Sequence, residues 1–334
     1  MIELRGRSER FGERSDWLRR RLASLLASLA AASILLFLVV RLLPGDPANA
    51  LLSAESTPEQ IAAARRLVGS DVPLQQQFLH WLGQLGTLDF GESFISGLDV
   101  RAEIASRLAI TVPLTLGGFV LALFVAVPVG YLAAARARSW LGVLIGNLSQ
   151  FGIAIPVFWV GIVLTFVFAL RLGWLPAGGF PLDGWSERGE AMRSLLLPVL
   201  TIAIVMSASL TRYVRSATLD VIGSDFIRTA RAQGASYGRA MWQHGLRNAA
   251  APVISVLGID LATTFIGAVV VEQVFALPGL GSLLVRAIAQ HDYQVIQGVL
   301  FVSTLVVLCS GFVADLIQRL VDPRLAATRA GHAR

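Results

Sequence analysis

The chain has 334 residues, of which 55% are hydrophobic and only 15% are charged, and its mean hydropathy is +0.66. Soluble domains carry about 25% charged residues, so this balance predicts a membrane protein. All 28 basic Lys+Arg residues are arginines, which excludes a phosphate-binding loop of the G-x-x-x-x-G-K-[ST] type and a Schiff-base lysine. Nucleotide hydrolysis of that kind therefore belongs to another polypeptide.

The remaining composition argues against metal, cofactor and nucleic-acid chemistry. The four histidines stand far apart and Cys309 is the only cysteine, so we expect no bound metal, no cofactor and no intrachain disulfide. In so apolar a chain, the high isoelectric point indicates a bias toward one membrane face rather than a nucleic-acid partner.

Six apolar segments are long enough to cross a bilayer as helices, which takes about 20 residues each. We predict transmembrane helices at residues 22–43, 108–135, 141–170, 194–212, 249–272 and 294–315. The third lies in a long uncharged stretch that is too short for two helices and a turn, so we expect one span with interfacial ends. The fold class is therefore an all-α membrane protein with six transmembrane helices.

The first apolar segment has an alternative interpretation as a signal peptide, because arginines precede it and residues 48–50 have the A-x-A form. The segment is longer than the usual 7–15 residues, and Arg41 and Pro44 intervene before that site, so a retained membrane helix is favoured. Residues 1–21 then form an N-terminal tail, polar and mobile over 1–16.

Arginine placement gives the orientation. Six spans put both termini, the turn at 136–138 and the loop with its flanking residue, 212–247, on one side, with 19 arginines against seven acidic residues. The other side has nine arginines and thirteen acidic residues. The positive side is expected to be cytoplasmic, so both termini, including the tail 321–334, are cytoplasmic.

The predicted extracytoplasmic segments contain local helix signals. Residues 44–107 form the longest, in which Thr57 and Pro58 predict the start of an amphipathic helix. Residues 275–292 contain a turn followed by a short helix ending near Ala289. Within the spans, Gly142 and Gly146 favour close helix approach, and four prolines predict kinks: Pro113, Pro128, Pro156 and Pro198.

The cytoplasmic loop 213–248 is rich in arginine and punctuated by glycine. Residues 227–232 predict a short helix that stops at Gly234, and Ser236 can cap a second helix through Gln243. Arg228, Arg231 and Arg239 are expected to point toward an acidic partner or toward lipid headgroups, and composition alone leaves both open.

At this loop the chain resembles the permeases of ATP-binding-cassette importers, specifically the peptide/nickel branch. The family pattern is Glu-Ala-Ala, three residues, Gly, nine residues, Ile-x-Leu-Pro. Ala230, Gly234 and Leu246 match it, whereas Arg228, Thr229, His244 and Arg247 replace its other residues. Further matches lie at residues 41–47, 88–91, 172–176, 274–281 and 321–324, so the resemblance covers about residues 22–325.

The resemblance implies a type I importer permease whose transmembrane domain spans residues 108–320. The loop 213–248 would couple it to ATPases through Arg228, Thr229, Ala230, Gly234 and Leu246. Implied partners are a second permease, one or two ATPase subunits and an extracytoplasmic solute-binding protein, within membrane lipid. The implied substrate is a di- or oligopeptide; nickel, glutathione and other small solutes use the same branch.

Two acidic residues near or within the fifth span need explanation. Burying Asp260 costs at least about 2.5–3.5 kcal/mol, so it is expected to face protein or water. It either lines the translocation path or makes a helix–helix hydrogen bond. Glu272 is expected to anchor the segment 275–292.

Two other classes of function compete with a transport subunit. An ion-coupled carrier acting alone would be expected to have an inverted repeat or several intramembrane carboxylates, and only Asp260 is central. A membrane-embedded enzyme would need a catalytic arrangement of Ser/Lys, His/Glu or paired Asp, which the spans lack. We expect a non-catalytic subunit.

Overall fold

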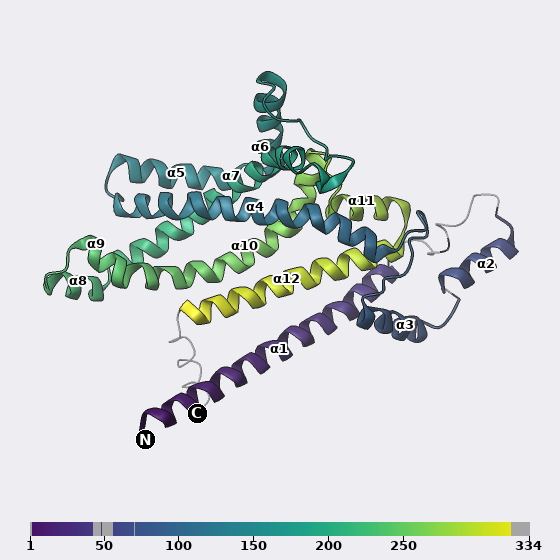
Figure 1. The fold of residues 1–334 in the computed structure, drawn as a ribbon, viewed down its shortest axis with the longest axis horizontal. Coiled ribbons are helices and arrows are strands. Elements are labelled where there is room, and N and C mark those ends of the chain that lie inside the picture. The colour runs from purple at the N-terminus through teal and green to yellow at the C-terminus, as the bar shows by residue number, and fades with distance from the viewer. Residues whose placement is uncertain (1, 43–47, 49–55, 70, 322–334) are drawn as a thin grey trace. The chain divides into compact units, whose positions relative to one another are not determined.

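The computed structural model describes residues 2–42, 48, 56–69 and 71–321, and the described residues are predominantly helical (Figure 1). Within that part of the chain no β-strand is present, so the predicted all-α class is confirmed. The chain divides into two compact units, each described by itself. The first is Met1–Ala105 with Leu284–Phe312, and the second is Ser106–Leu283 with Val313–Arg334.

Five unbroken helices of the described chain are long and apolar enough to cross a membrane. They contain Asp16–Arg41, Val100–Ala135, Arg188–Ile222, Asn248–Val274 and Tyr293–Val321. A sixth candidate is a bent pair, Trp140–Ala154 with Val157–Arg171. Counting that pair as one span gives the six that were predicted.

The predicted span over 141–170 is sharply bent at Pro156, one of the four prolines that predict kinks. Helix α5 (Trp140–Ala154) and helix α6 (Val157–Leu164), which continues as a π-helix at Thr165–Arg171, meet at an angle of 100°. The break lies at Ile155, whose backbone is extended (φ −81°, ψ 123°), and Pro156 follows. The proline ring disfavours helical geometry in the preceding residue, which accounts for the break.

The other three prolines lie inside continuous helices. Helix α4 (Val100–Ala135) runs through Pro113 and Pro128, and helix α7 (Arg188–Ile222) runs through Pro198. Pro113 lacks the N–H that would bond to the carbonyl of Ala109. The indole Nε1 of Trp185 donates to that carbonyl at 2.9 Å instead, so the helix tolerates this proline.

The first unit begins with a helix longer than predicted. Helix α1 (Ile2–Leu42) is continuous, so the residues expected as a mobile tail are helical. Helix α2 (Pro58–Val68) starts at the predicted Thr57 cap, and helix α3 (Leu74–Thr87) follows. Phe37 of α1 contacts Phe78 and Trp81 of α3, with ring centroids 5.2 and 5.7 Å apart.

A buried polar contact also holds this unit together. The hydroxyl of Ser93 donates to Asp292, which precedes helix α12 (Tyr293–Val321), at 2.5 Å. Helix α11 (Leu280–Gln290) confirms the short helix that the sequence predicts within residues 275–292. Of the resembling motifs, residues 43–47 and 322–324 lie outside the described residues.

In the second unit, α5, α6 and α10 (Leu246–Val274) pack against α7 (Figure 1). Glycines allow α4 to approach α7 closely. A Cβ atom at Gly118 would lie 2.5 Å from Cγ2 of Ile202, and one at Gly130 would lie 2.7 Å from Cβ of Val214. Of the predicted Gly142–Gly146 pair, Gly142 approaches the end of α4, where an added Cβ would lie 3.0 Å from the carbonyl oxygen of Ala133, and Gly146 faces the Arg215 side chain of α7.

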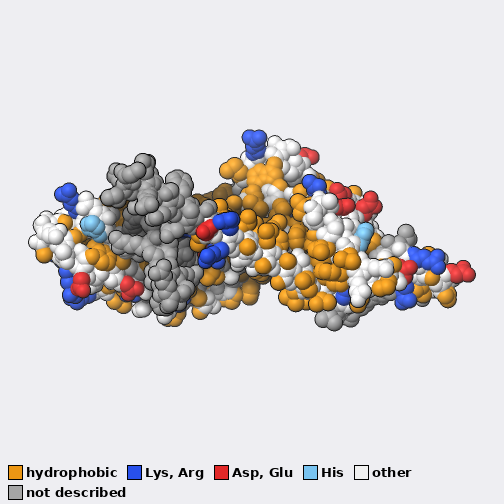
Figure 2. Space-filling model, turned by 90° about the horizontal axis from the view of Figure 1, so that it is seen from below, with side chains coloured by type: hydrophobic (Ala, Val, Ile, Leu, Met, Phe, Trp, Pro, Cys, Tyr) orange, Lys and Arg blue, Asp and Glu red, His pale blue; other side chains and the backbone are white. Residues whose placement is uncertain are grey.

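The exposed surface of the described residues is strongly apolar. Figure 2 shows broad areas of hydrophobic side chains between scattered charged ones. Large apolar side chains such as Phe124, Phe151 and Ile266 are 78%, 72% and 61% exposed. Such a surface is expected for helices that face lipid.

Candidate functional site

The basic loop 213–248 folds into short helices at the end of α7. That helix ends at Ile222, and Ser224 has the extended backbone of an N-cap residue (φ −76°, ψ 151°). Helix α8 (Asp225–Ala232) and helix α9 (Tyr237–Ala240) follow. The loop therefore has the two-helix form that the sequence predicts.

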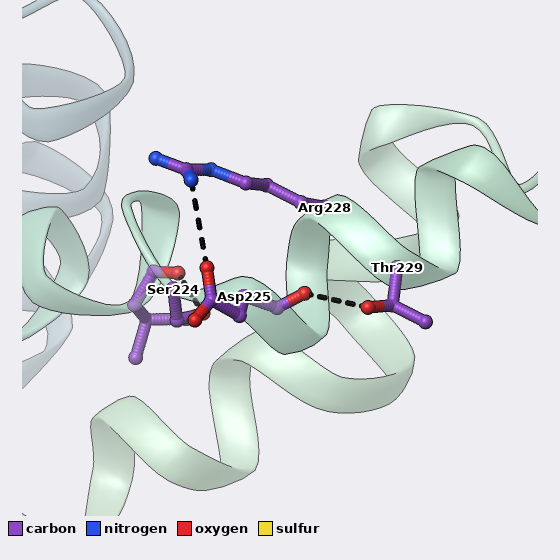
Figure 3. A network of polar contacts seen from close by, with 5 residues as sticks. Ser224, Asp225, Arg228 and Thr229 are labelled. Carbon is purple, nitrogen blue, oxygen red and sulfur yellow. Dashed lines mark hydrogen bonds and ion pairs between the residues drawn. The ribbon is translucent and has the colours of Figure 1, made fainter.

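A polar network covers the start of α8 (Figure 3). The guanidinium of Arg228 lies 3.5 Å from the carboxylate of Asp225, and the hydroxyl of Thr229 donates to the Asp225 carbonyl at 2.9 Å. Asp225 in the first turn also suits the positive end of the helix dipole. The Arg228 and Asp225 side chains are 76% and 94% exposed, so their pairing contributes little and both remain open to a partner.

Gly234 ends α8 in the manner predicted. Its φ is +92°, and no atom would lie within 4 Å of an added Cβ. Its N–H donates to Arg231 at 3.0 Å and the next N–H, of Ala235, donates to Ala230 at 3.1 Å. These two bonds form a Schellman motif. The left-handed backbone, rather than a lack of space, requires glycine here.

An apolar cluster anchors α8 and α9 to the long helices of this unit. Ile227 is 2% exposed and packs in a cluster with residues of α7, α9 and α10. The members are Ala217, Val221, Ile227, Ala240, Met241 and Ala249, with Tyr131 and Ala230 packed against them. Outside this cluster α8 carries exposed Arg228 and Thr229, and Thr229 lies on the helix face opposite Ile227.

The second helix does not end at Gln243 as predicted. Residues Met241–Gly245 form a π-helix that continues directly into α10 at Leu246. An added Cβ at Gly245 would collide with the Met241 side chain. The basic loop is thus joined to a membrane helix without an intervening turn.

Two aromatic side chains exposed on this loop, Trp242 and Phe226, were not singled out from the sequence, whereas the exposed Leu246 was. Trp242 is 76% exposed, Phe226 is 41% exposed and Leu246 is 36% exposed. A lone tryptophan in a polar loop is the signal that could have marked them, because exposed aromatic residues are enriched at interfaces. Burial of Tyr237 raises the pKa of its phenol, Tyr131 raises it further and Arg231 lowers it.

The predicted path residue Asp260 lies apart from this loop, in the middle of α10. One carboxylate oxygen, Oδ2, is buried and has no hydrogen-bond partner in the described part of the chain. Its backbone carbonyl accepts the hydroxyls of Thr263 and Thr264. Among the described residues, no group of three His, Cys, Asp or Glu side chains is arranged to hold a metal ion.

Glu272, near the other end of α10, anchors the following segment as expected. It is fully buried, and its carboxylate accepts the hydroxyl of Thr111 at 2.6 Å and the N–H of Ser282 at 2.9 Å. The Thr111 hydroxyl accepts the N–H of Leu280 at 2.8 Å. These bonds tie the start of α11 to α4 and α10.

The amino-acid sequence is similar to known transport permeases over most of its length. Residues 126–327 match the family model described as binding-protein-dependent transport system inner membrane component, and residues 15–115 match the corresponding N-terminal model. The oligopeptide transport system permease protein AppB of Bacillus subtilis (strain 168) is 38% identical over 310 residues, 92% of this chain and 98% of that protein. The glutathione transport system permease protein GsiC of Salmonella typhimurium is 36% identical over 310 residues, 93% and 98% of the two chains.

Solved structures of a methionine transporter share the fold. A chain of the MetNI methionine ABC transporter, in an inward-facing conformation, matches with a TM-score of 0.54 and 19% identity. The match covers 66% of this chain and 96% of that chain. At this identity the likeness concerns the fold alone.

Proposed function

The chain belongs to the family of binding-protein-dependent transport system inner membrane components, and from that premise we propose that it forms half of the translocation pathway of a peptide importer. The proposed importer is powered by ATP-binding-cassette subunits on the cytoplasmic side. The peptide assignment rests on the names of the relatives, which are oligopeptide and glutathione permeases.

The observation that carries the proposal is the construction of α8. One face is fixed to the long helices through Ile227, and the other presents Arg228 and Thr229 to solvent. A fixed helix with a free polar face suits docking to a second subunit. Arg228, Thr229, Ala230, Gly234 and Leu246 are the proposed ATPase-coupling residues, although Ala230 contributes to the anchor rather than to the free face.

ATP hydrolysis is assigned to partner subunits because the chain has no lysine for a phosphate-binding loop. The remaining proposed partners are a second permease and an extracytoplasmic solute-binding protein. The arginine bias supports a cytoplasmic location for the basic loop and both termini. Labelling of residues 226–240 from outside the cell would contradict this orientation.

The proposal is tested by Gly234→Val in the assembled transporter. A β-branched residue in the left-handed region costs about 1–2 kcal/mol or more, which should displace the end of α8. Peptide uptake and peptide-stimulated ATP hydrolysis should fall several-fold, with membrane insertion unchanged.

The matched control is Gly238→Val, because Gly238 has no positive φ and nothing within 4 Å of its Cβ position. This control should retain uptake. Unchanged uptake by the Gly234 variant would overturn the docking role of α8.

A further inference from the structure

A cavity of about 520 Å³ lies in the second unit, between the loop that follows α6 and the first turns of α7. Its walls include the aromatic and apolar side chains of Trp174, Leu175 and Phe180, and the polar side chains of Glu190 and Arg193. Ligand sites in proteins are commonly of this size, with mostly apolar walls and a few placed polar groups. The basic loop and Asp260 take no part in it.

The loop that forms the cavity is held to α10 by its backbone. The N–H of Gly179 donates to the carbonyl of Phe275 at 2.7 Å. A Cβ atom at the adjacent Gly178 would lie 2.5 Å from that carbonyl oxygen. Two consecutive glycines therefore allow a contact that no other residue pair could make without displacement.

Side chains fix the other edges of the cavity. Trp185 packs edge-on against Phe180, with centroids 5.5 Å apart, while its indole donates to Ala109 of α4. Arg193 donates to the carbonyl of Trp174 at 3.1 Å. The cavity is thus preformed, which lowers the entropic cost of binding a ligand.

Two oppositely charged side chains line this cavity without forming an ion pair with each other in the described structure. Glu190 and Arg193 are three residues apart on α7, which places their Cβ atoms about 5–6 Å apart on one helix face. Within the described residues there is no ion pair between them, and the Glu190 side chain makes no hydrogen bond. One N–H of the Arg193 guanidinium donates to the Trp174 carbonyl, and its other N–H groups can donate to a ligand.

We propose that this cavity binds the two free ends of a short peptide. Glu190 takes the terminal ammonium, Arg193 takes the terminal carboxylate, and Trp174, Leu175 and Phe180 contact an apolar side chain. An extended chain reaches about 3.3–3.6 Å per residue, so the ends of a dipeptide lie about 7 Å apart, close to the roughly 5–6 Å between the Cβ atoms of Glu190 and Arg193. The inference rests on the proposed peptide importer and on the extracytoplasmic placement of this loop.

The test is equilibrium binding of alanyl-phenylalanine to the full chain in lipid nanodiscs, measured by calorimetry. The wild-type chain should bind the free dipeptide at least about tenfold more tightly than its N-acetylated form or its C-terminal amide, since each loses one charge-assisted contact. Glu190→Gln should abolish only the discrimination against the acetylated form. Arg193→Gln should abolish only the discrimination against the amide.

The matched controls are Glu187→Gln and Arg188→Gln, exposed neighbours that do not line the cavity. Both should retain full discrimination. Equal binding of free and blocked dipeptides by the wild-type chain, or the same loss in the control variants, would overturn the site. Uptake of the dipeptide by the assembled transporter is measured separately, and its absence beside intact binding would refute the importer and not the site.

Discussion

Replacing Thr111 with valine should detach the start of α11 from the helices beneath it. The hydroxyl of Thr111 both donates to the buried Glu272 carboxylate and accepts the N–H of Leu280. Valine has nearly the same shape and can do neither. A buried N–H left without a partner costs about 1–3 kcal/mol, and a hydrogen bond to a charged group contributes about 1.5–3 kcal/mol. The combined cost is therefore about 2.5–6 kcal/mol.

Hydrogen–deuterium exchange of residues 276–284 measures this effect directly. If the free energy of local opening falls by about 3 kcal/mol, the amides of this segment should exchange roughly 100-fold faster. Thr115→Val is the matched control, because the equally buried Thr115 hydroxyl donates only to carbonyls of its own helix. Equal exchange in the two variants would refute the anchoring role of Thr111 and Glu272.

Three further substitutions test other contacts of the second unit. Trp185→Phe leaves the Ala109 carbonyl without its indole donor and should lower the free energy of unfolding by about 1–3 kcal/mol; adding Pro113→Ala, which restores a backbone donor, should recover most of the loss in thermal unfolding. Ile227→Ala should cost about 2–5 kcal/mol of anchoring, seen as faster amide exchange in α8 and weaker uptake. Burial raises the pKa of the Tyr237 phenol above 10.0. The neutral phenol therefore contributes fully to stability below pH 10, and this contribution is lost as the phenol ionises at higher pH. Tyr237→Phe should remove this alkaline loss of protection, measured by amide exchange in α9.

Features set by neighbouring residues could be predicted from the sequence. The stop of α8 at Gly234, the Ser236 cap, the Thr57 cap and the short helix before Asp292 each depend on residues within one turn. Glycine at a left-handed position and a hydroxyl before a helix have direct backbone reasons. The same locality explains why six spans could be counted from apolar length.

Features that depend on distant partners could not be predicted. The Ala109 carbonyl, which Pro113 leaves without a backbone donor, is satisfied by Trp185, 76 residues away, and the sequence gives no sign of that contact. The cavity likewise depends on contact between Gly179 and Phe275. The π-helix at Met241–Gly245 has no sequence signature of its own and was missed.

One helix connects the features on which the proposed mechanism depends. Helix α10 begins at Leu246 beside the basic loop, carries Asp260 near its middle and buries Glu272 near its end. At about 1.5 Å per residue, Leu246 and Glu272 are about 39 Å apart along the axis. The Phe275 carbonyl, directly after this helix, holds the cavity loop. A displacement of α8 can therefore reach the proposed peptide site along one continuous element, and reciprocity then requires peptide binding to change the affinity of the ATPase contact by the same factor.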